Sequence, residues 1–239
     1  MKERIFIPII CYNHIANTEF MISLIRLTHH LRDNDISYCL YPIVFESLIP
    51  RARNAAAAHF LDSDCSHLLF IDADIEFDPE SVVKLLRHNK QVVAGVYPKK
   101  YYMWDRALTG EEAVDFPFGG EVHFNQDGLI ETTYLPTGFL MIKREVFIKI
   151  ASNKPELKYK NDIDGYGQLD TFYNFFRSGV HNGIYESEDW GFCSIWRELG
   201  GKVLIDPTIK LGHIGWNNFS GNPLKWCQEA INRYNQKHS

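Results

Sequence analysis

The chain has 239 residues, 45% of them hydrophobic and 23% charged, and its formal net charge is -5. This length allows one large α/β domain with a substantial core, and the composition is typical of a soluble globular protein. The acidic balance gives no reason to expect nucleic acid as a partner. Because no apolar run approaches about 18 residues, we also expect no membrane span.

The cysteines and the N-terminal residues indicate the cellular compartment in which the protein is expected. Five cysteines are scattered along the chain without a C-x-x-C pair, and the sequence opens without a signal-peptide pattern. We interpret the cysteines as reduced, mostly buried thiols, with neither a disulfide framework nor a zinc site. A cytoplasmic protein is therefore expected.

The first 98 residues alternate between apolar runs typical of buried strands and segments with helical spacing. We expect Asn17 to cap the first helix, and Asp78 with Pro79 to open the third. The order β-α-β-α-β-α-β predicts a parallel, doubly wound sheet with right-handed crossovers. The predicted strands are 4–12, 36–45, 67–71 and 91–97. The predicted helices are one that follows Asn17 and closes at 33–35, one over 50–61 and one over 79–89. In the first helix, Phe20, Met21, Leu24, Leu27 and Leu31 recur at helical spacing.

The pattern changes after Pro98. Residues 99–120 show no clear hydrophobic period, and we expect them to form a functional excursion from the sheet. Residues 152–186 also lack a period, and we expect them to form a mobile surface loop. An Asp-Gly turn joins 122–124 to 129–134 as a hairpin. The other predicted elements are strands 138–142 and 202–205, helix 144–150, helix 188–199 ending at Gly200-Gly201, and a C-terminal helix 223–234 with Leu224, Cys227 and Ile231 facing inward.

The most informative stretch is the strand 67–71 with the acids Asp72 and Asp74 after it. Alternate side chains leave a strand on the same face, so the two carboxylates point the same way. Such a pair at the edge of an open α/β sheet suits a divalent cation that grips a diphosphate. The structural alternative, that the acids cap the next helix, is weakened because Asp78 already supplies that cap.

Other polar residues reach the same predicted edge. Arg53 and Asn54 follow the second strand and can bond a nucleotide or the acidic strand, although a solvated basic face is favoured for Arg51 and stays open for Arg53. Glu188 and Asp189 begin a helix, where the dipole favours carboxylates. We favour Asp189 as a general base toward a sugar hydroxyl, with Glu188 holding the acceptor or the loop.

Three further cationic or metal-binding side chains lie in the second half. His213 stands between glycines after the last predicted strand, and its imidazole is a good third ligand for a manganese-like ion, although a lone histidine is usually structural. Lys99 and Lys100 can meet phosphate as point charges, although paired lysines often serve only solubility.

Together these residues resemble GT-A fold glycosyltransferases, the class with a DXD motif that uses nucleotide sugars. The resemblance is closest to small glycosyltransferases of chlorella viruses, phages and bacteria. It extends over most of residues 4–216 and rests on the combination of its motifs, each of which is weak alone. The matching segments are LIPRARNAAAAHFL (48–61), HLLFIDADIEF (67–77), VVAGVYPKK (92–100), LPTGFLMIKREVF (135–147) and ESEDWGFCSIWRELGGKVLIDPTIKLGHIG (186–215).

The resemblance implies a single GT-A domain, in which residues 1–98 bind the nucleotide and 99–239 the sugar and acceptor. It implies a mostly parallel Rossmann-like sheet flanked by helices, with an added antiparallel hairpin. It also implies Mn²⁺ or Mg²⁺ as cofactor, a nucleotide-sugar donor with uridine as the commonest base, a glycan or glycoprotein acceptor, and the host cytoplasm if the protein is viral.

By the same resemblance, each residue has an implied role. Asp74 binds the metal directly and His213 is a further metal ligand, while Asp72 contacts the ribose or, through water, the metal. Asp189 and Glu188 stand on the acceptor side. The donor site consists of Pro8, Ile10, Tyr12, Glu46, Arg53, Asn54, Asp72, Ala73, Lys99, Gly138 and Phe139.

Two rival functions remain open at this stage. Metal-dependent phosphoryl transfer also uses Asp-x-Asp pairs, but the aspartyl-nucleophile type would place acids after the first strand, where Ile9-Ile10-Cys11 has none. A non-catalytic nucleotide-sugar or carbohydrate-binding module would not need Glu188, Asp189 and His213. The stereochemistry of transfer and the oligomeric state are not encoded in these motifs.

Overall fold

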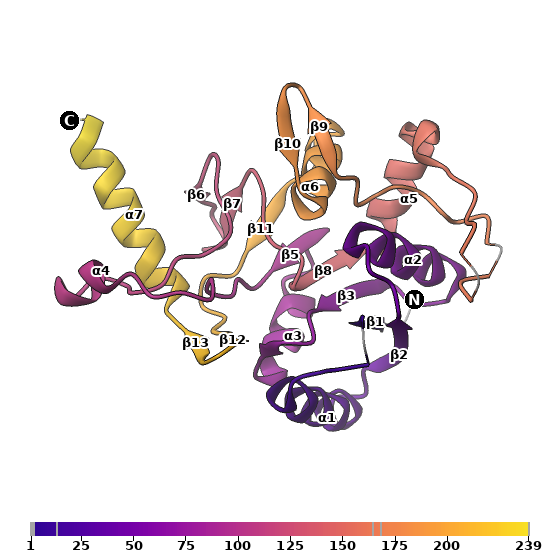
Figure 1. The fold of residues 1–239 in the computed structure, drawn as a ribbon, viewed down its shortest axis with the longest axis horizontal. Helices are drawn as coiled ribbons and strands as arrows, with labels where there is room; N and C mark the ends of the chain where they lie inside the picture. The colour runs from indigo at the N-terminus through magenta and orange to yellow at the C-terminus, as the bar shows by residue number, and fades with distance from the viewer. Residues whose placement is uncertain (1–2, 13, 164, 168, 239) are drawn as a thin grey trace.

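The computed structural model describes residues 3–12, 14–163, 165–167 and 169–238. Its centre is an eight-stranded sheet to which both halves of the sequence contribute (Figure 1). From one edge to the other, the strands are β2 (Ser37–Val44), β1 (Arg4–Cys11), β3 (His67–Ile71), β8 (Phe139–Lys143), β5 (Val92–Ala94), β11 (Val203–Ile205), β7 (Ile130–Thr132) and β6 (His123–Phe124).

Strand direction confirms a mostly parallel sheet with an antiparallel hairpin. Strand β1 pairs in parallel with β2 and β3, and β5 pairs in parallel with β11. Strand β8 is antiparallel to both β3 and β5, and β7 is antiparallel to β11 and β6. Only β8 and β7 therefore run against the other six. One feature was not predicted: β8 lies between β3 and β5, which do not pair with each other.

Helices cover both faces of the sheet (Figure 1). On one face lie α1 (Thr18–Asp33) and α3 (Pro79–Arg87), and on the other α2 (Ile49–Asp62), α5 (Arg144–Asn153) and α6 (Glu188–Glu198). Along β3, Leu68 and Phe70 pack toward α2, whereas Leu69 and Ile71 pack toward α1 and α3. A strand covered on both faces reads as a continuous apolar run, which is why the sequence revealed it.

The helix ends agree with the predictions in part. Asp78 caps α3 by accepting a hydrogen bond from the Glu80 amide at 2.8 Å, and Gly200 follows α6 with a φ of +78°, which favours glycine. Asn17 precedes α1, but its side chain makes no capping bond and donates instead to the Ala73 carbonyl at 3.4 Å. Of the apolar residues at helical spacing in α1, Met21 is 41% exposed, and the others are buried.

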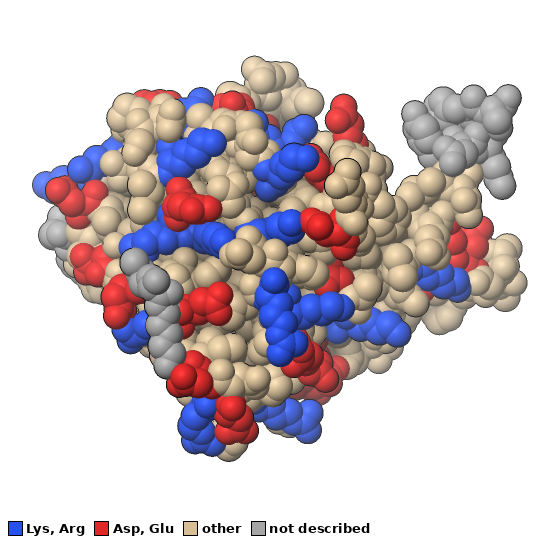
Figure 2. Space-filling model, turned by 180° about the vertical axis from the view of Figure 1, so that it is seen from behind, with Lys and Arg blue, Asp and Glu red and all other residues tan. Residues whose placement is uncertain are grey.

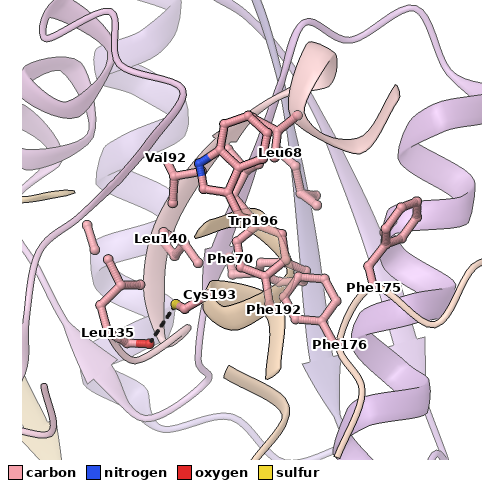
Figure 3. Close-up of a cluster of buried hydrophobic side chains, with 14 of the residues drawn as sticks. Leu68, Phe70, Val92, Leu135, Leu140, Phe175, Phe176, Phe192, Cys193 and Trp196 are labelled. Atoms are coloured by element: carbon pink, nitrogen blue, oxygen red, sulfur yellow. Dashed lines mark hydrogen bonds between the residues drawn. The ribbon is translucent and has the colours of Figure 1, made fainter. Parts of the chain in front are cut away.

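The segment 152–186 is not simply a surface loop. It contains a 3-10 turn η1 (Pro155–Leu157) and a hairpin of β9 (Gly179–His181) and β10 (Ile184–Glu186). Phe172, Phe175 and Phe176 are fully buried. Figure 3 shows Phe175 and Phe176 in one cluster with Phe192 and Trp196 of α6 and Phe70 of β3. The expectation of a surface loop is therefore wrong for 172–176, which form part of the core.

A second, three-stranded sheet was missed. It contains β4 (Ile75–Glu76), β12 (Gly212–Ile214) and β13 (Asn218–Ser220). His213 pairs with Ile75 in the register of β12 and β4, and the Ile214 amide donates to the Asp74 carbonyl at 2.8 Å. These short strands attach a distant part of the chain to the residues just after Asp74.

The C-terminal helix packs on the excursion that follows Pro98. Helix α7 (Pro223–His238) and the short helix α4 (Trp104–Leu108) extend to one side of the sheet (Figure 1). Trp226 contacts the rings of Phe116 and Phe118 and donates to Asp115 Oδ1 at 3.0 Å. Cys227 is buried as expected, whereas Leu224 and Ile231 are half-buried.

The surface and the thiols complete the description. On the face shown in Figure 2, basic and acidic side chains lie interspersed. All five cysteines are free, and four of them are buried. Within the described ranges, no helix combines the length and the apolar character needed to cross a membrane.

Candidate active site

A cleft of about 550 Å³ opens where β1 and β3 end and α6 begins. Ligands of open α/β sheets bind outside the carboxyl ends of the strands, which is where this cleft lies. It is lined by Ile10, Cys11, Tyr12, Ile15, Asn17, Glu46, Ser47, Ile49, Arg53, Asp72, Ala73, Asp74, Tyr97, Thr137, Glu188 and Asp189.

Arg53 connects the two acidic elements of the cleft. Its Nη2 lies 3.0 Å from Asp72 Oδ1 and its Nε lies 3.4 Å from Glu188 Oε1. Only 4% of the Arg53 side chain is exposed, and its guanidinium lies over the Phe70 ring. Burial alone would lower the pKa of Arg53, but the two carboxylates outweigh it and raise that pKa. Arg53 is therefore a buried cation that links the end of β3 to the start of α6, and not part of a solvated face.

The backbone around Gly138 fits tightly against Asp72 and Tyr97. The Asp72 amide donates to the Gly138 carbonyl at 3.0 Å. A Cβ at position 138 would lie 2.5 Å from Tyr97 Cε1 and 2.6 Å from Asp72 Oδ2, so only glycine leaves space for both side chains. Gly138 thus reaches the site through its backbone. Phe139, by contrast, is fully buried against Phe77, so the structure does not place it in a sugar pocket.

Tyr97 is a cleft residue that sequence reasoning missed. Burial, followed by the charge of Asp72, holds its pKa well above the ordinary value. Its phenol therefore stays protonated at neutral pH and can donate a hydrogen bond. Its ring also meets His213, with centroids 4.7 Å apart. The available signal was its place three residues after β5, because that strand runs in the direction of β3 and ends at the same edge.

Asp74 and His213 form the candidate metal centre. His213 Nε2 lies 3.4 Å from Asp74 Oδ2, and His213 Nδ1 lies 2.8 Å from the Pro98 carbonyl. Since a carbonyl can only accept, Nδ1 carries a hydrogen. Nε2 is the nitrogen that faces Asp74, and its lone pair can bind a metal when the ring is neutral. Metal-binding histidines are typically fixed in this way, by a backbone carbonyl on the other nitrogen.

The charge state of Asp74 also suits a cation. Burial raises its pKa, but hydrogen bonds with His213 and Lys100 outweigh burial and lower it. The residues that the structure describes contain no group of three His, Cys, Asp or Glu side chains arranged around one metal. Asp72, predicted as a further ligand, is held instead by Arg53. Two protein ligands fit a cation such as Mn²⁺ or Mg²⁺ that completes its shell with phosphate oxygens and water.

The rim of the cleft includes several predicted donor residues. Ile10, Tyr12 and Ala73 line it, as does Glu46. Glu46 receives two bonds from Arg51, at 2.6 and 2.8 Å. Burial raises the pKa of Glu46, but the bonds from Arg51 and the Leu48 amide outweigh it, so this carboxylate stays ionised.

Three other predicted donor residues lie elsewhere. Pro8 is buried within β1, three residues before that strand ends. Asn54 accepts from the Phe176 amide and donates to Asn174 Oδ1, both at 2.9 Å, so it anchors the aromatic segment to α2. Lys99 binds Asp115 at 3.0 Å, whereas Lys100 reaches Asp74. The structure does not bring Pro8, Asn54 or Lys99 to the cleft.

Asp189 lies at the junction of two hollows. It lines the main cleft and also a smaller hollow of about 230 Å³. Its Oδ1 accepts from the Trp190 amide at 2.8 Å and from the Ser187 hydroxyl, which fixes the carboxylate at the start of α6. The smaller hollow is lined by Lys99, Phe116, Pro117, Phe118, Tyr134, Ser187, Asp189 and Trp190.

Comparison with known proteins finds likeness in structure. No protein-family model and no curated protein matches the chain. The crystal structure of A197 from STIV is similar with a TM-score of 0.50 and 20% identity, over 94% of this chain and 92% of A197. At that identity the likeness concerns the fold alone.

Two glycosyltransferase structures are also similar, with lower TM-scores. A crystal structure of GalNAc-T7 with UDP, GalNAc and Mn²⁺ has a TM-score of 0.45 and 12% identity, over 90% of this chain and 44% of that one. A glycosyltransferase involved in glycosylation of the major capsid of PBCV-1 has a TM-score of 0.33 and 11% identity, over 64% and 66%. The expected fold class, an α/β arrangement with a mostly parallel central sheet flanked by helices and an added antiparallel hairpin, is confirmed.

Proposed function

We propose that this protein is a metal-dependent glycosyltransferase that moves a sugar from a nucleotide diphosphate sugar, with UDP-sugar as the first choice, to a hydroxyl of a glycan or glycoprotein. The observation that carries the proposal is that one cleft contains both Asp74, which is backed by His213, and Asp189, which also borders a second hollow. A donor diphosphate and an acceptor hydroxyl need this pair of neighbouring sites.

In this proposal, the first half of one GT-A domain binds the nucleotide. Ile10, Tyr12 and Glu46 border the part of the cleft formed by β1 and β2, where base and ribose would bind. Asp72 and Ala73 lie beside them, and Arg53 fixes the Asp72 carboxylate. Because Arg53 is buried and itself held by Glu188, Asp72 keeps one orientation when the donor arrives.

Asp74 and His213 would hold the cation. When bound, Mn²⁺ or Mg²⁺ supplies Lewis-acid neutralisation of the diphosphate leaving group. Asp74 contributes an ionised carboxylate, and His213 contributes Nε2, with the ring oriented by the Pro98 carbonyl. The chain's own task here is to keep both donors ready before the substrate binds.

Asp189 is assigned as the general base. It takes the proton of the acceptor hydroxyl while the bond from the sugar to the diphosphate breaks and the bond from the sugar to the acceptor oxygen forms. Glu188 is unsuited to this task because it is bound to Arg53 and only 16% exposed. We assign Glu188 as the positioning residue that fixes Arg53.

The test is a panel of nucleotide sugars incubated with the purified protein, with and without Mn²⁺. We expect Mn²⁺-dependent release of the nucleoside diphosphate and thermal stabilisation by one base across several sugars. Asp74→Ala should lower turnover at least about 100-fold, since a metal contributes several kcal/mol. The matched control is Asp64→Ala, whose side chain is 75% exposed beside Arg4.

Two results would contradict the proposal. Phosphate release from a generic phosphoester without turnover of any nucleotide sugar would indicate phosphoryl transfer. Binding of a nucleotide sugar without turnover under any metal condition would indicate a binding module. NMR of the product's anomeric proton reports whether configuration is inverted or retained.

A further inference from the structure

Lys100 lies at the position on Asp74 where a metal would bind. Its Nζ is 2.6 Å from Asp74 Oδ2, the same oxygen that faces His213 Nε2 at 3.4 Å. One carboxylate oxygen therefore meets an ammonium and an imidazole together. The oxygen cannot also accept a divalent ion at close range while the ammonium stays, because the two cations would repel each other at contact distance.

The position of Lys100 is built into the fold. Lys100 lies two residues after Pro98, whose carbonyl binds His213. The same short segment therefore orients the histidine and places the lysine beside Asp74. The Lys100 stem lies along Gly215, where a Cβ would be 3.1 Å from Lys100 Cδ. The neighbouring lysine is used differently, since Lys99 binds Asp115.

The Lys100 side chain can also leave. Its side chain is 36% exposed and Asp74 is 30% exposed, so the ion pair borders solvent. A lysine has a flexible four-carbon stem and an ammonium that bonds phosphate as a point charge. A donor diphosphate bound next to Asp74 would supply the negative charge that the ammonium loses when it leaves the carboxylate.

We propose that Lys100 is an exchangeable counter-cation: it neutralises Asp74 when the site is empty and moves to the donor diphosphate when the divalent ion takes its place. This rests on the proposed function and adds to it a cooperative binding of the metal and the nucleoside diphosphate. Metal alone must displace the ammonium, whereas metal with a nucleoside diphosphate gives the ammonium a new partner. The two ligands therefore enhance each other's affinity, and by linkage the enhancement is reciprocal.

The experiment measures Mn²⁺ binding by the disappearance of the EPR signal of free Mn²⁺, with and without UDP. Wild type, Lys100→Met and Lys202→Met are compared. Methionine keeps an unbranched apolar stem and removes the charge. Lys202 pairs with Glu131 at 2.8 Å on the β11–β7 edge, so Lys202→Met makes the same change in net charge away from the site.

We expect Lys100→Met to bind Mn²⁺ alone about tenfold more tightly than wild type, and to lose about the same factor of the enhancement by UDP. Lys202→Met should match wild type in both. A second variant, Gly215→Ala, keeps the charge but crowds the Lys100 stem, and should also tighten Mn²⁺ binding in the absence of UDP.

Unchanged or weaker Mn²⁺ binding by Lys100→Met overturns the proposal, and so does an equal effect in Lys202→Met. These outcomes differ from failure of the proposed function. If wild type binds no Mn²⁺ even with UDP present, the metal-dependent transferase itself is wrong.

Discussion

The two halves of the chain build the cleft in different ways. The first half places Glu46, Asp72 and Asp74 directly after β2 and β3, so the positions of its polar groups follow from where strands end. The second half contributes Asp189 from a helix start and His213 from the β12–β13 hairpin, whose position depends on β4. The ends of β2 and β3 explain why the first three groups share one edge of the sheet, whereas the positions of Asp189 and His213 beside them depend on long-range packing.

The largest expected effect tests what the second half contributes to chemistry. Asp189→Asn should lower kcat about 10²–10⁴-fold, the range for losing a general base, while thermal stabilisation by the nucleotide sugar persists. Glu188→Gln should cost less than about tenfold, because it weakens only the support of Arg53. Steady-state kinetics and thermal shifts measure both. Equal losses in the two variants would mean that Asp189 is not the base.

The next effect tests whether residues 172–176 of the second half belong to the hydrophobic core or only cover its surface. Phe176→Ala should destabilise the protein by about 3–5 kcal/mol, the usual cost of truncating a buried phenylalanine. Phe124→Ala, at a residue 39% exposed on the edge strand β6, should cost less than about 1 kcal/mol. Urea unfolding midpoints provide the comparison. Similar midpoints for both variants would show that residues 172–176 do not belong to the folded core.

The smallest expected effect is on stability and concerns His67 in the first half. This residue begins β3, whereas Asp72 and Asp74 follow its other end. Burial, with a smaller contribution from Lys143, lowers the pKa of His67 from 6.5 to about 4. Between these values the unfolded chain binds the extra proton, so stability is full above pH 6.5 and declines as the pH falls toward 4. The decline attributable to this residue should be about 2 kcal/mol between pH 7.5 and 5.

The variant His67→Gln isolates that contribution. Its midpoint in urea should fall less than that of wild type over the same pH interval, even though its stability at pH 7.5 is lower. Parallel pH profiles for the two proteins would show that His67 does not titrate as its burial requires.

The first half of the fold was predictable because β1, β3 and β5 are mostly buried apolar runs and because its third helix carries a clear start signal, Asp78-Pro79. The insertion of β8 between β3 and β5 was not, because pairing partners far apart in sequence leave no local trace. The same applies to β12, since Gly212–Ile214 is too short to show an alternating pattern. The aromatic segment 172–176 lacks any period, and its burial becomes clear only when α2 and α6 are in place.

The candidate site follows the same rule, down to neighbouring positions. Arg53 and Asn54 are adjacent in α2, but successive helical residues are rotated by about 100°, so one faces the cleft and the other the aromatic segment. Gly138 and Phe139 differ likewise, because the backbone of the first meets Asp72 while the ring of the second enters the core. The sequence motif identified the segment that borders the cleft. The backbone geometry of the helix or strand then determines which residue of that motif reaches it.

The placement of β8 between β3 and β5 affects how the protein can fold during its synthesis on the ribosome. A nascent chain that has emerged only as far as residue 98 has the complete strands β3 and β5, but the strand that must lie between them has yet to be synthesised. Until β8 is synthesised, the backbone N–H and C=O groups with which β3 and β5 bind β8 have no strand partner. Asp72 and Asp74 can take up their final positions only after residue 143 leaves the exit tunnel, so the first half of the chain cannot complete its folding ahead of the rest.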